Sequence, residues 1–309
     1  MLLEPTPIQY LGKLPGGQDI FMKRDDLLGF SFGGNKCRLA AAFLEDMEEK
    51  GKDFMVSYGS PASNLNRTVA GMCKSRGIPC LLIVAGEDGD QELTFNRQMA
   101  AAFGAEQVEC SKSRVAETVG QVLEELRGRG YDPYYLYGSR YGTGNEAAAR
   151  KAYQKAYNEI YKWQNESRIK LTHIFHASGT GMTQGGLMAG RRGAGGKEEI
   201  VGISVARDRE RGEAAVRRYA GDGPEAILFE DEYRCGGYGL YDRDIERVIG
   251  EMMDSHGIAL DPTYTGKAYA GMEKWLESRG TGRETVLFIH TGGLPLYFDY
   301  LNKKRNPAV

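Results

Sequence analysis

The sequence lacks several features that would assign it to a familiar class at once. No apolar run approaches the ~20 residues that a membrane-spanning helix needs, and the stretch from Met1 to Pro5 does not resemble a secretion signal. The 40 basic and 42 acidic residues give a formal net charge of −2. No excess of positive charge is present to attract nucleic acid or an anionic membrane, and we expect neither as a partner.

Cysteine and histidine are too few and too scattered for a disulfide or metal framework. The five cysteines form an odd count without a CxxC pair, which argues against a structural zinc site and favours a reducing, cytoplasmic setting. His173 and His176 would lie on opposite faces of a strand, so we predict no bound metal. The motifs HExxH and Walker A are absent.

Short apolar runs that alternate with helical patterns are what the chain does contain. The expected strands cover residues 54–58, 80–84, 107–110, 134–137, 173–176, 201–205 and 286–290. The expected helices cover residues 36–50, 63–76, 92–103, 114–129, 146–166, 184–191 and 241–256. Alternation of this kind predicts an α/β fold with parallel, doubly wound sheets.

The length of 309 residues is too great for one small core and predicts two α/β domains. We place the smaller domain at residues 45–150 and build the larger one from residues 1–44 and 151–309. Ligands of parallel sheets bind beyond the carboxyl ends of strands, in the loops that begin the next helix. Those loops are therefore the first place to look for chemistry.

The first candidate loop is Gly33-Gly34-Asn35-Lys36. Two glycines allow a sharp turn and a close approach of the backbone to a ligand. Lys36 opens a helical pattern, where burial and the helix N-terminus would lower the pKa of its amine and favour Schiff-base formation. A surface lysine in a glycine turn is the alternative that this segment alone favours.

Four further loops carry hydroxyl groups, amides or glycines at strand or helix ends. Ser63 and Asn64 follow a strand and suit either helix capping or anion binding. Residues 178–186 combine hydroxyls, four glycines and a helix start, which favours a phosphate cradle. Residues 261–267 and 290–293 each place a hydroxyl beside glycine, which turn chemistry alone can explain.

In order along the chain, GGNK, SxxSN, SGTGxTQ, DPxYxGK and HTGG resemble the pyridoxal 5′-phosphate (PLP) enzymes of fold type II. Within that group the chain resembles the family of D-cysteine desulfhydrase and 1-aminocyclopropane-1-carboxylate (ACC) deaminase, from Thr6-Pro7 and Lys23-Arg24-Asp25-Asp26 to Thr291-Gly292-Gly293. The resemblance implies a fold like the β subunit of tryptophan synthase, a larger PLP-binding domain, an active site in the cleft between the domains, and a homodimer.

The resemblance also implies a role for each matching residue. Lys36 would carry PLP as a Schiff base and move the α-proton, with Ser63 and Tyr264 as its catalytic neighbours. The cofactor-binding residues would be Lys36, Asn64 at the phenolic oxygen, Thr180, Gly181, Met182 and Thr183 at the phosphate, and Thr291 at the pyridine nitrogen.

Two positions separate the activities within this family. ACC deaminases carry glutamate after the tyrosine of DPxYxGK and leucine in place of the threonine of HTGG, whereas this chain has Thr265 and Thr291. A hydroxyl leaves the pyridine nitrogen more neutral than a carboxylate would, which suits elimination of a good β leaving group. We therefore expect a small amino acid as substrate, with D-cysteine the first candidate and pyruvate, sulfide and ammonia as products.

Leu65 departs from the family pattern and leaves the substrate open. Glutamine or histidine usually stands there and helps to hold the substrate carboxylate. ACC deamination and sulfite release from cysteate are alternatives on the same scaffold, and a PLP-binding protein without this activity is a third. A nicotinamide-dependent oxidoreductase is the alternative from another class, based on Gly142-x-Gly144-x-x-Ala147, although no clear ribose-binding acid accompanies it.

Overall fold

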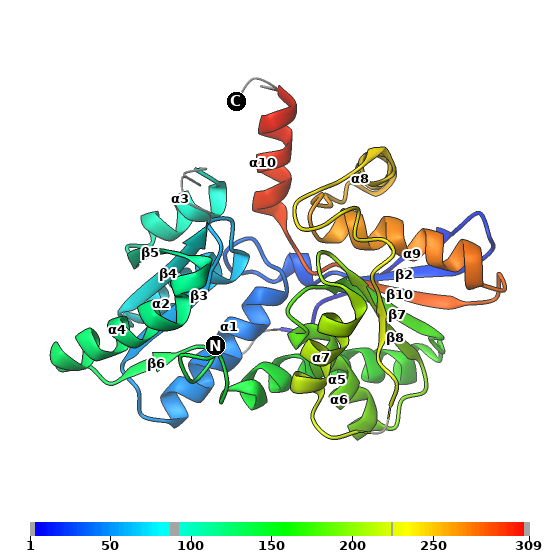
Figure 1. Cartoon of the computed structure of the whole chain (residues 1–309). Coiled ribbons are helices and arrows are strands. Elements are labelled where there is room, and N and C mark those ends of the chain that lie inside the picture. The colour runs from blue at the N-terminus through cyan, green and yellow to red at the C-terminus, as the bar shows by residue number, and fades with distance from the viewer. Residues whose placement is uncertain (1–3, 87–92, 224, 306–309) are drawn as a thin grey trace. The chain divides into compact units, whose positions relative to one another are not determined.

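The computed structural model describes residues 4–86, 93–223 and 225–305, which form two compact units (Figure 1). The smaller unit is Lys36–Ala148, and the larger unit takes residues from both sides of it. The predicted boundary after residue 44 falls inside helix α1 (Asn35–Glu49), whereas the structure divides the chain at the start of that helix. Hydrogen bonds join successive turns of a helix, so a helix interior is a poor place for a division.

The smaller unit is built on four parallel strands in the order β5-β4-β3-β6. The strands are β3 (Phe54–Gly59), β4 (Cys80–Gly86), β5 (Glu106–Ser111) and β6 (Pro133–Tyr135). The helices are α1, α2 (Asn64–Arg76), α3 (Phe95–Ala102) and α4 (Val115–Gly128), with a short 3-10 turn at Lys112–Arg114. Val56 and Ile83 of the sheet pack against Val119 and Leu126 of α4 in the apolar core of this unit.

Every predicted strand and helix of the smaller unit has a counterpart in the structure, with small differences at the ends. Glu92, the predicted first residue of the helix that corresponds to α3, lies outside the described residues. The prediction of an α/β fold with parallel sheets is confirmed. Within the described ranges, no helix is both long and apolar enough to cross a membrane.

The larger unit holds six strands in the order β1-β2-β10-β7-β8-β9. The strands are β1 (Ile8–Lys13), β2 (Asp19–Lys23), β7 (His173–Ser178), β8 (Glu199–Ser204), β9 (Leu228–Glu230) and β10 (Thr285–Ile289). Only β1 is antiparallel to its neighbour among these described strands. The helices are α5 (Glu146–Ser167), most of which belongs here, α6 (Met182–Ala194), α7 (Arg209–Ala220), α8 (Arg243–His256), α9 (Thr265–Arg279) and α10 (Leu294–Arg305), with a 3-10 turn at Asp25–Leu27.

Several elements of the larger unit were not predicted, namely β1, β2, β9, α7, α9 and α10. Helix α9 has all of residues 265–272 buried, so it lacks the polar stripe that reveals a surface helix in a sequence. Strand β1 has the opposite difficulty, because it lies at the sheet edge and none of its residues is fully buried. Periodicity is informative only where one face is buried and the other is not.

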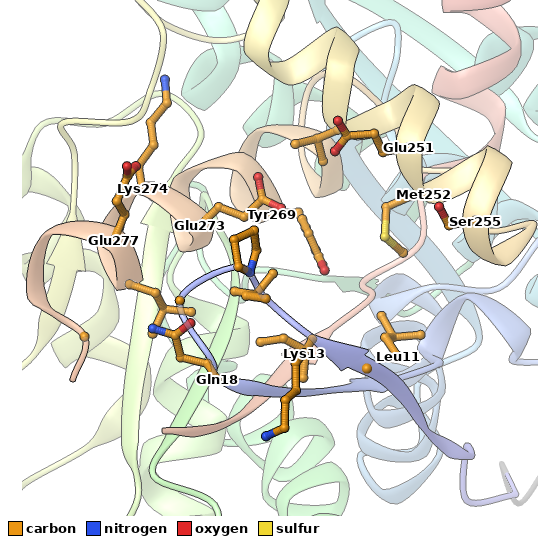
Figure 2. Close-up of a pocket in the computed structure, with 18 of the residues that line it drawn as sticks. Leu11, Lys13, Gln18, Glu251, Met252, Ser255, Tyr269, Glu273, Lys274 and Glu277 are labelled. Atoms are coloured by element: carbon orange, nitrogen blue, oxygen red, sulfur yellow. The ribbon is translucent and has the colours of Figure 1, made fainter. Parts of the chain in front are cut away.

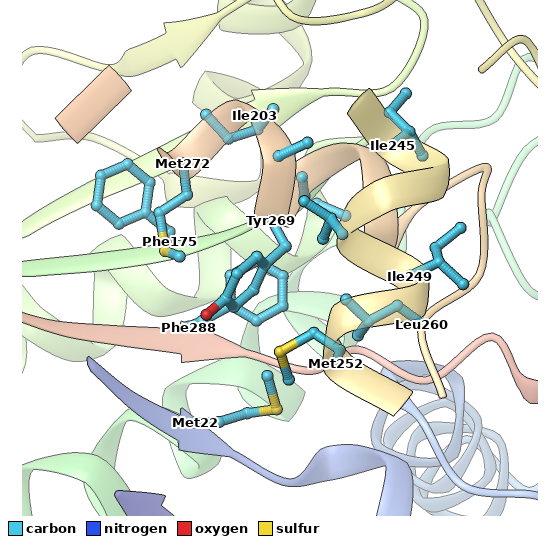
Figure 3. Close-up of a cluster of buried hydrophobic side chains, with 14 of the residues drawn as sticks. Met22, Phe175, Ile203, Ile245, Ile249, Met252, Leu260, Tyr269, Met272 and Phe288 are labelled. Carbon is cyan, nitrogen blue, oxygen red and sulfur yellow. The ribbon is translucent and has the colours of Figure 1, made fainter. Parts of the chain in front are cut away.

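The apolar core of the larger unit lies between its sheet and helices α8 and α9 (Figure 3). Phe175 of β7 meets Trp275 of α9 edge-on, and Phe288 of β10 meets Tyr269 of the same helix in the same way. On the other face of the sheet, Gly202 of β8 lies against α6. The sheet is therefore covered by helices on both faces, as parallel sheets generally are.

Helices α5 and α6 approach closely because two glycines of α6 face two tyrosines of α5. A Cβ at Gly186 would come closer to Tyr153 than real contacts allow, and one at Gly190 would lie 2.6 Å from the Cβ of Tyr157. Both tyrosines are fully buried. The tyrosine-rich stretch of α5 thus serves helix packing.

Alanine substitution in α6 tests this packing with a matched pair. Gly190→Ala should destabilise the protein by about 1–3 kcal/mol, the usual effect of overpacking a tight core contact. Gly193→Ala, in the same helix, places its Cβ more than 4 Å from any described atom outside the local backbone, and it should stabilise by up to about 1 kcal/mol because alanine favours helices. Urea unfolding measures both, and equal effects of the two substitutions would contradict the packing account.

Candidate active site

At the Gly33-Gly34 turn, the main chain lies in close contact with two other backbone segments of the larger unit. The φ angle is +65° at Gly33 and +95° at Gly34, a region that favours glycine. A Cβ at Gly33 would overlap the carbonyl oxygen of Asp26, and one at Gly34 would lie 2.7 Å from the carbonyl oxygen of Thr291. Main-chain contact therefore requires both glycines, whatever ligand binds nearby.

A buried ionic network anchors this turn to α5. Lys23 Nζ donates to Thr6 Oγ1 at 2.7 Å and pairs with Glu159 Oε2 at 2.5 Å. Thr6 Oγ1 in turn donates to Asp25 Oδ1 at 2.7 Å. The carbonyl oxygen of Asp25 accepts the N–H of Gly34 at 2.7 Å. Buried charges need such partners, so this network is a reason for the acidic and basic residues that precede the turn.

Asn35 joins two of the predicted loops within the larger unit. Its backbone N–H donates to the carbonyl oxygen of Thr291 at 3.0 Å, and its Nδ2 donates to Thr183 Oγ1 at 3.2 Å. Lys36 follows Asn35 directly and occupies the first turn of α1. The larger unit thus holds the residue that precedes Lys36 beside both the predicted phosphate loop and the predicted pyridine loop.

The predicted phosphate loop connects β7 to α6. Gly181 has a φ of +86°, and a Cβ there would lie 2.6 Å from the backbone of α7, so only glycine fits. No side chain caps α6, which leaves its first backbone N–H groups for an anion. Thr180 is exposed, Met182 is the buried first residue of the helix, and the buried Thr183 accepts from Asn35. Both threonines can therefore direct their hydroxyl protons to a ligand.

Asp261 organises the DPTYTGK loop from a fully buried position. Its carboxylate accepts the N–H groups of Thr263, Tyr264 and Thr265 at 2.8–3.0 Å. Burial raises the pKa of Asp261, and these hydrogen bonds oppose the rise. The hydroxyl of Thr265 donates to the same carboxylate at 2.8 Å and accepts the N–H of Asp261 at 2.9 Å. Thr265 therefore uses its hydroxyl inside the loop.

The HTGG loop follows β10 and is fixed by its histidine. His290 Nδ1 accepts the N–H of Gly292 at 3.1 Å, and Nε2 lies 2.9 Å from the carbonyl oxygen of Ala259. A carbonyl can only accept, so this pattern assigns the neutral tautomer with its proton on Nε2. Thr291 is buried, and its hydroxyl makes no hydrogen bond to any residue that the structure describes. That hydroxyl remains available to a bound group.

Tyr264 has an aromatic neighbour that the sequence analysis missed. Its hydroxyl lies 3.1 Å from that of Tyr238, and the two rings meet edge-on with centroids 5.9 Å apart. The fully buried Lys267 donates to the carbonyl oxygens of Arg234 at 2.8 Å and Gly237 at 2.6 Å, which fixes the segment that carries Tyr238. No motif marks Tyr238, because its proximity to Tyr264 arises only from the fold.

In the smaller unit, Ser63 and Asn64 stand at the start of α2, directly after β3. Ser63 Oγ accepts the N–H of Asn66 at 3.2 Å, so this serine caps the helix. A Cβ at Gly59 would overlap the side chain of Ser63, which explains the glycine at the end of β3. The serine hydroxyl accepts in this cap, and its proton remains for a ligand. Leu65 is buried.

Two donors fix the side-chain orientation of Asn64. Arg67 Nη2 and Asn96 Nδ2 lie 3.3 Å and 3.1 Å from Asn64 Oδ1. Asn96 must present its amide nitrogen there, because that nitrogen also donates to the carbonyl oxygen of Ala62 at 2.9 Å, and a guanidinium can only donate. Asn64 therefore keeps Nδ2 as the group that can donate to a ligand. Arg67 and Asn96 were not predicted.

Lys36 is half-buried, and burial lowers the pKa of its amine from 10.5 to about 8. At that pKa about a tenth of the amine is neutral at pH 7, against a far smaller part for an ordinary lysine. A neutral amine can attack a carbonyl or accept a proton, whereas an ammonium group can do neither. The sequence-based expectation of a lowered pKa is confirmed.

Parallel α/β units with an anion-binding helix start and an activated lysine are typical of enzymes that bind a phosphorylated cofactor. A family model described as "Pyridoxal-phosphate dependent enzyme" matches residues 1–292. A putative ACC deaminase of Pyrococcus abyssi is 31% identical over 308 residues, covering 96% of this chain and 91% of that protein. A D-cysteine desulfhydrase of Klebsiella pneumoniae is 28% identical over 312 residues, covering 96% and 94%.

Solved structures of enzymes also resemble this chain. The crystal structure of an ACC deaminase homologue matches with a TM-score of 0.84 and 30% identity, covering 97% of this chain and 93% of that one. A hydrogen sulfide-producing enzyme of Fusobacterium nucleatum matches with a TM-score of 0.63 at 17% identity, which concerns the fold alone. The chain belongs to the PLP-dependent enzyme family, and its relatives include ACC deaminases and D-cysteine desulfhydrases. It is a PLP-dependent enzyme.

The groups that the two units present fit this cofactor. The larger unit offers an uncapped helix start with two threonines, which suits a phosphate, and a buried threonine hydroxyl at residue 291 that makes no hydrogen bond to a described residue. The smaller unit offers the oriented amide of Asn64 and the lysine of lowered pKa. The segment 142–147, on which the nicotinamide alternative was based, runs into the start of α5 and does not directly follow a strand, and that alternative is not supported.

The orientation of Asn64 can be reversed by one isosteric substitution. Asn96→Asp keeps the shape of the side chain but offers only acceptors, so Asn64 would turn Nδ2 towards it and lose its donor for the cofactor. We expect PLP affinity to fall by about five-fold, the effect of one neutral hydrogen bond, together with a shift of the visible absorption band. Gln98→Glu makes the same chemical change at an exposed position of α3 and should alter neither. An unchanged spectrum in the first variant would contradict the assignment.

The lowered pKa of Lys36 predicts how the apoenzyme takes up PLP at different pH values. Only the neutral amine reacts, so the rate of covalent uptake should rise as pH approaches about 8 and level off above it. An ordinary lysine would continue to gain rate up to about pH 10.4. Stopped-flow absorbance gives the rate, and borohydride reduction followed by peptide mass mapping gives the residue. A label on any other lysine would refute the assignment.

Proposed function

We propose that this enzyme catalyses β-elimination on a small amino acid, with Lys36 as both the point of cofactor attachment and the base that takes the α-proton. The observation that carries the proposal is the pair of hydrogen bonds from Asn35 to the Thr183 and Thr291 loops, since they hold the chain next to Lys36 beside both loops. The lowered pKa of Lys36 supports its role in proton transfer.

When bound, PLP supplies an electron sink for the charge that develops at the α-carbon. The residues of the chain hold and orient the cofactor. Thr180, Gly181, Met182 and Thr183 bind the phosphate through the start of α6, and Asn64 donates its amide to the phenolic oxygen. Thr291 directs its hydroxyl to the pyridine nitrogen. These assignments agree with the hydrogen bonds that each of these groups makes or leaves open.

Ser63 and Tyr264 act next to the substrate in this proposal. The hydroxyl proton of Ser63 is not used by the helix cap, so it can hydrogen-bond the substrate. Tyr238 keeps the hydroxyl of Tyr264 in place, and Lys267 keeps Tyr238 in place. We propose the pair of tyrosines, and not Tyr264 alone, as the group that exchanges protons with the departing substituent.

D-cysteine is the first candidate substrate. The hydroxyl at position 291 favours it, because it offers the pyridine nitrogen a neutral partner where ACC deaminases carry leucine. The glutamate that would keep this nitrogen protonated stands at the position of Thr265 in those enzymes, and it is absent here. Thr265 agrees less directly, since its hydroxyl is engaged with Asp261 and it leaves no charge towards the cofactor. ACC deamination is the second candidate, because a relative at 31% identity carries the name of that activity. Release of sulfite from cysteate remains a third possibility on the same scaffold.

A panel of D-cysteine, L-cysteine, ACC and cysteate tests these candidates on the holoenzyme. Pyruvate with sulfide from D-cysteine is the expected result, and 2-oxobutyrate from ACC would favour the deaminase instead. Thr291→Val removes the hydroxyl with little change of shape and should lower kcat on D-cysteine by about ten-fold, as for loss of one strong hydrogen bond. Thr291→Ser is the control that keeps the hydroxyl and should retain most activity. Equal activity of the valine and serine variants would rule out this role.

We also propose a homodimer, which the family resemblance suggests, and a cytoplasmic location, which the dispersed cysteines suggest. Light scattering of the purified holoenzyme should give twice the mass of one chain. A monomeric mass would overturn the first of these proposals without affecting the assignment of Lys36.

A further inference from the structure

A cavity of about 970 Å³ lies in the larger unit (Figure 2). It is bounded by the hairpin of β1 and β2 on one side and by helices α8 and α9 on the other. None of the residues predicted to bind PLP or to act in catalysis lines it. Its volume falls in the range of small-molecule sites, roughly 300–1,000 Å³.

Apolar side chains form much of the wall of this cavity. Leu11 and Ile20 come from the hairpin, Val248 and Met252 from α8, and Leu276 from α9. Four of these belong to the buried core of the larger unit, and Leu11 packs against it. The wall is therefore preformed by the core and does not depend on a ligand to take shape.

Two polar groups are buried in this apolar wall. Gln18 is 3% exposed and Tyr269 is 5% exposed, and Figure 2 shows both side chains extending into the space between hairpin and helices. Neither side chain makes a hydrogen bond to a residue that the structure describes. A polar side chain that faces a cavity finds its hydrogen-bond partner in water or in a ligand, so both groups can receive a ligand with polar atoms.

Glycines on either side make room for the Gln18 amide. A Cβ at Gly16 would lie 2.6 Å from Gln18 Oε1, and one at Gly280 would lie 2.9 Å from Gln18 Nε2. Burial, with smaller effects of Glu273 and Glu251, raises the pKa of Tyr269, so its hydroxyl keeps its proton. Together the two groups offer donors and acceptors on the wall of the cavity.

The basic side chains around the cavity already have partners. Arg247 pairs with Glu251 at 2.5 Å and Glu273 at 2.9 Å. The two lysines that line the cavity are also paired, Lys274 with Asp244 at 2.6 Å and Lys13 with Asp19 at 2.8 Å. No lysine or arginine among the described lining residues is left to bind an anion. Glu277 pairs with no described residue, but it is exposed to solvent. The unmet polar groups in the buried part of the wall are neutral, and the matching head group is neutral as well.

We infer that this cavity is a second binding site, for an uncharged amphipathic small molecule. The apolar body of the ligand lies against Leu11, Met252 and Leu276, and an amide or hydroxyl head hydrogen-bonds Gln18 and Tyr269. This inference goes beyond the proposed function, because the site shares no residue with the PLP machinery.

Three probes with the same apolar chain test the chemistry of the head group. Hexanamide, hexanoate and pentyltrimethylammonium are titrated against the holoenzyme by saturation-transfer NMR, the last because its quaternary nitrogen cannot react with the cofactor. Hexanamide should bind, and the two ions should bind about ten-fold more weakly or not at all, since burying an unpaired charge costs more than burying an amide. No binding of hexanamide, or tighter binding of either ion, would overturn the inference.

Substitutions locate the bound probe. Gln18→Met and Tyr269→Phe should each weaken hexanamide binding by about five-fold, the effect of one neutral hydrogen bond. Leu11→Trp fills the cavity and should abolish binding. Gln121→Met, an exposed position on α4, is the control and should change nothing.

Thermal melting and the visible cofactor band report whether each variant is folded and loaded, because the cavity lies outside the predicted PLP site. A folded Gln18→Met protein that binds hexanamide as the wild type does would place the probe elsewhere and end the inference.

Discussion

At Gly33 and Gly34 the main chain passes so near to Asp26 and Thr291 that a side chain has no room. This contact determines where Asn35 can be, and Asn35 in turn joins the loop after β7 to the loop after β10. The buried network of Lys23 and Glu159 holds the turn through Asp25, which accepts the N–H of Gly34. Backbone sterics thus set the place of Asn35, the residue before Lys36. Burial lowers the pKa of Lys36 itself.

The DPTYTGK loop depends on a single buried side chain. One buried carboxylate, Asp261, receives three backbone N–H groups and one hydroxyl, and Gly293 of the next loop packs against it without a side chain. A glutamate in place of Thr265 would have to give up the hydroxyl bond to Asp261 and find another partner. Differences in activity between relatives at this position therefore involve the loop as a whole, and not only the charge near a cofactor.

The fold class could be predicted from the sequence, because it depends on local patterns, and the same patterns marked the loops on which the proposed function rests. Glycines, hydroxyls and a lysine at strand ends are visible without a structure, and so is the alternation of strands and helices. The sequence analysis missed Tyr238, Arg67 and Asn96. Each acts through a side-chain hydrogen bond to a predicted site residue, and no motif marks such a bond. Periodicity also failed for α9, which is buried along its first half, and for β1 at the sheet edge. Tertiary burial, which sequence patterns only approximate, decided these cases.

The strand order of the larger sheet has a consequence for how the chain folds. β10, close to the end of the chain, lies between β2 and β7, so the β1–β2 hairpin at the beginning is joined to the rest of the sheet only through β10 among the described strands. During synthesis the hairpin cannot pair with β10 until β10 has been made, and contacts of such long range form slowly. The turn before Lys36 leaves from this hairpin. The hydrogen bond from Asn35 to Thr291, which lies just after β10, can therefore form only late.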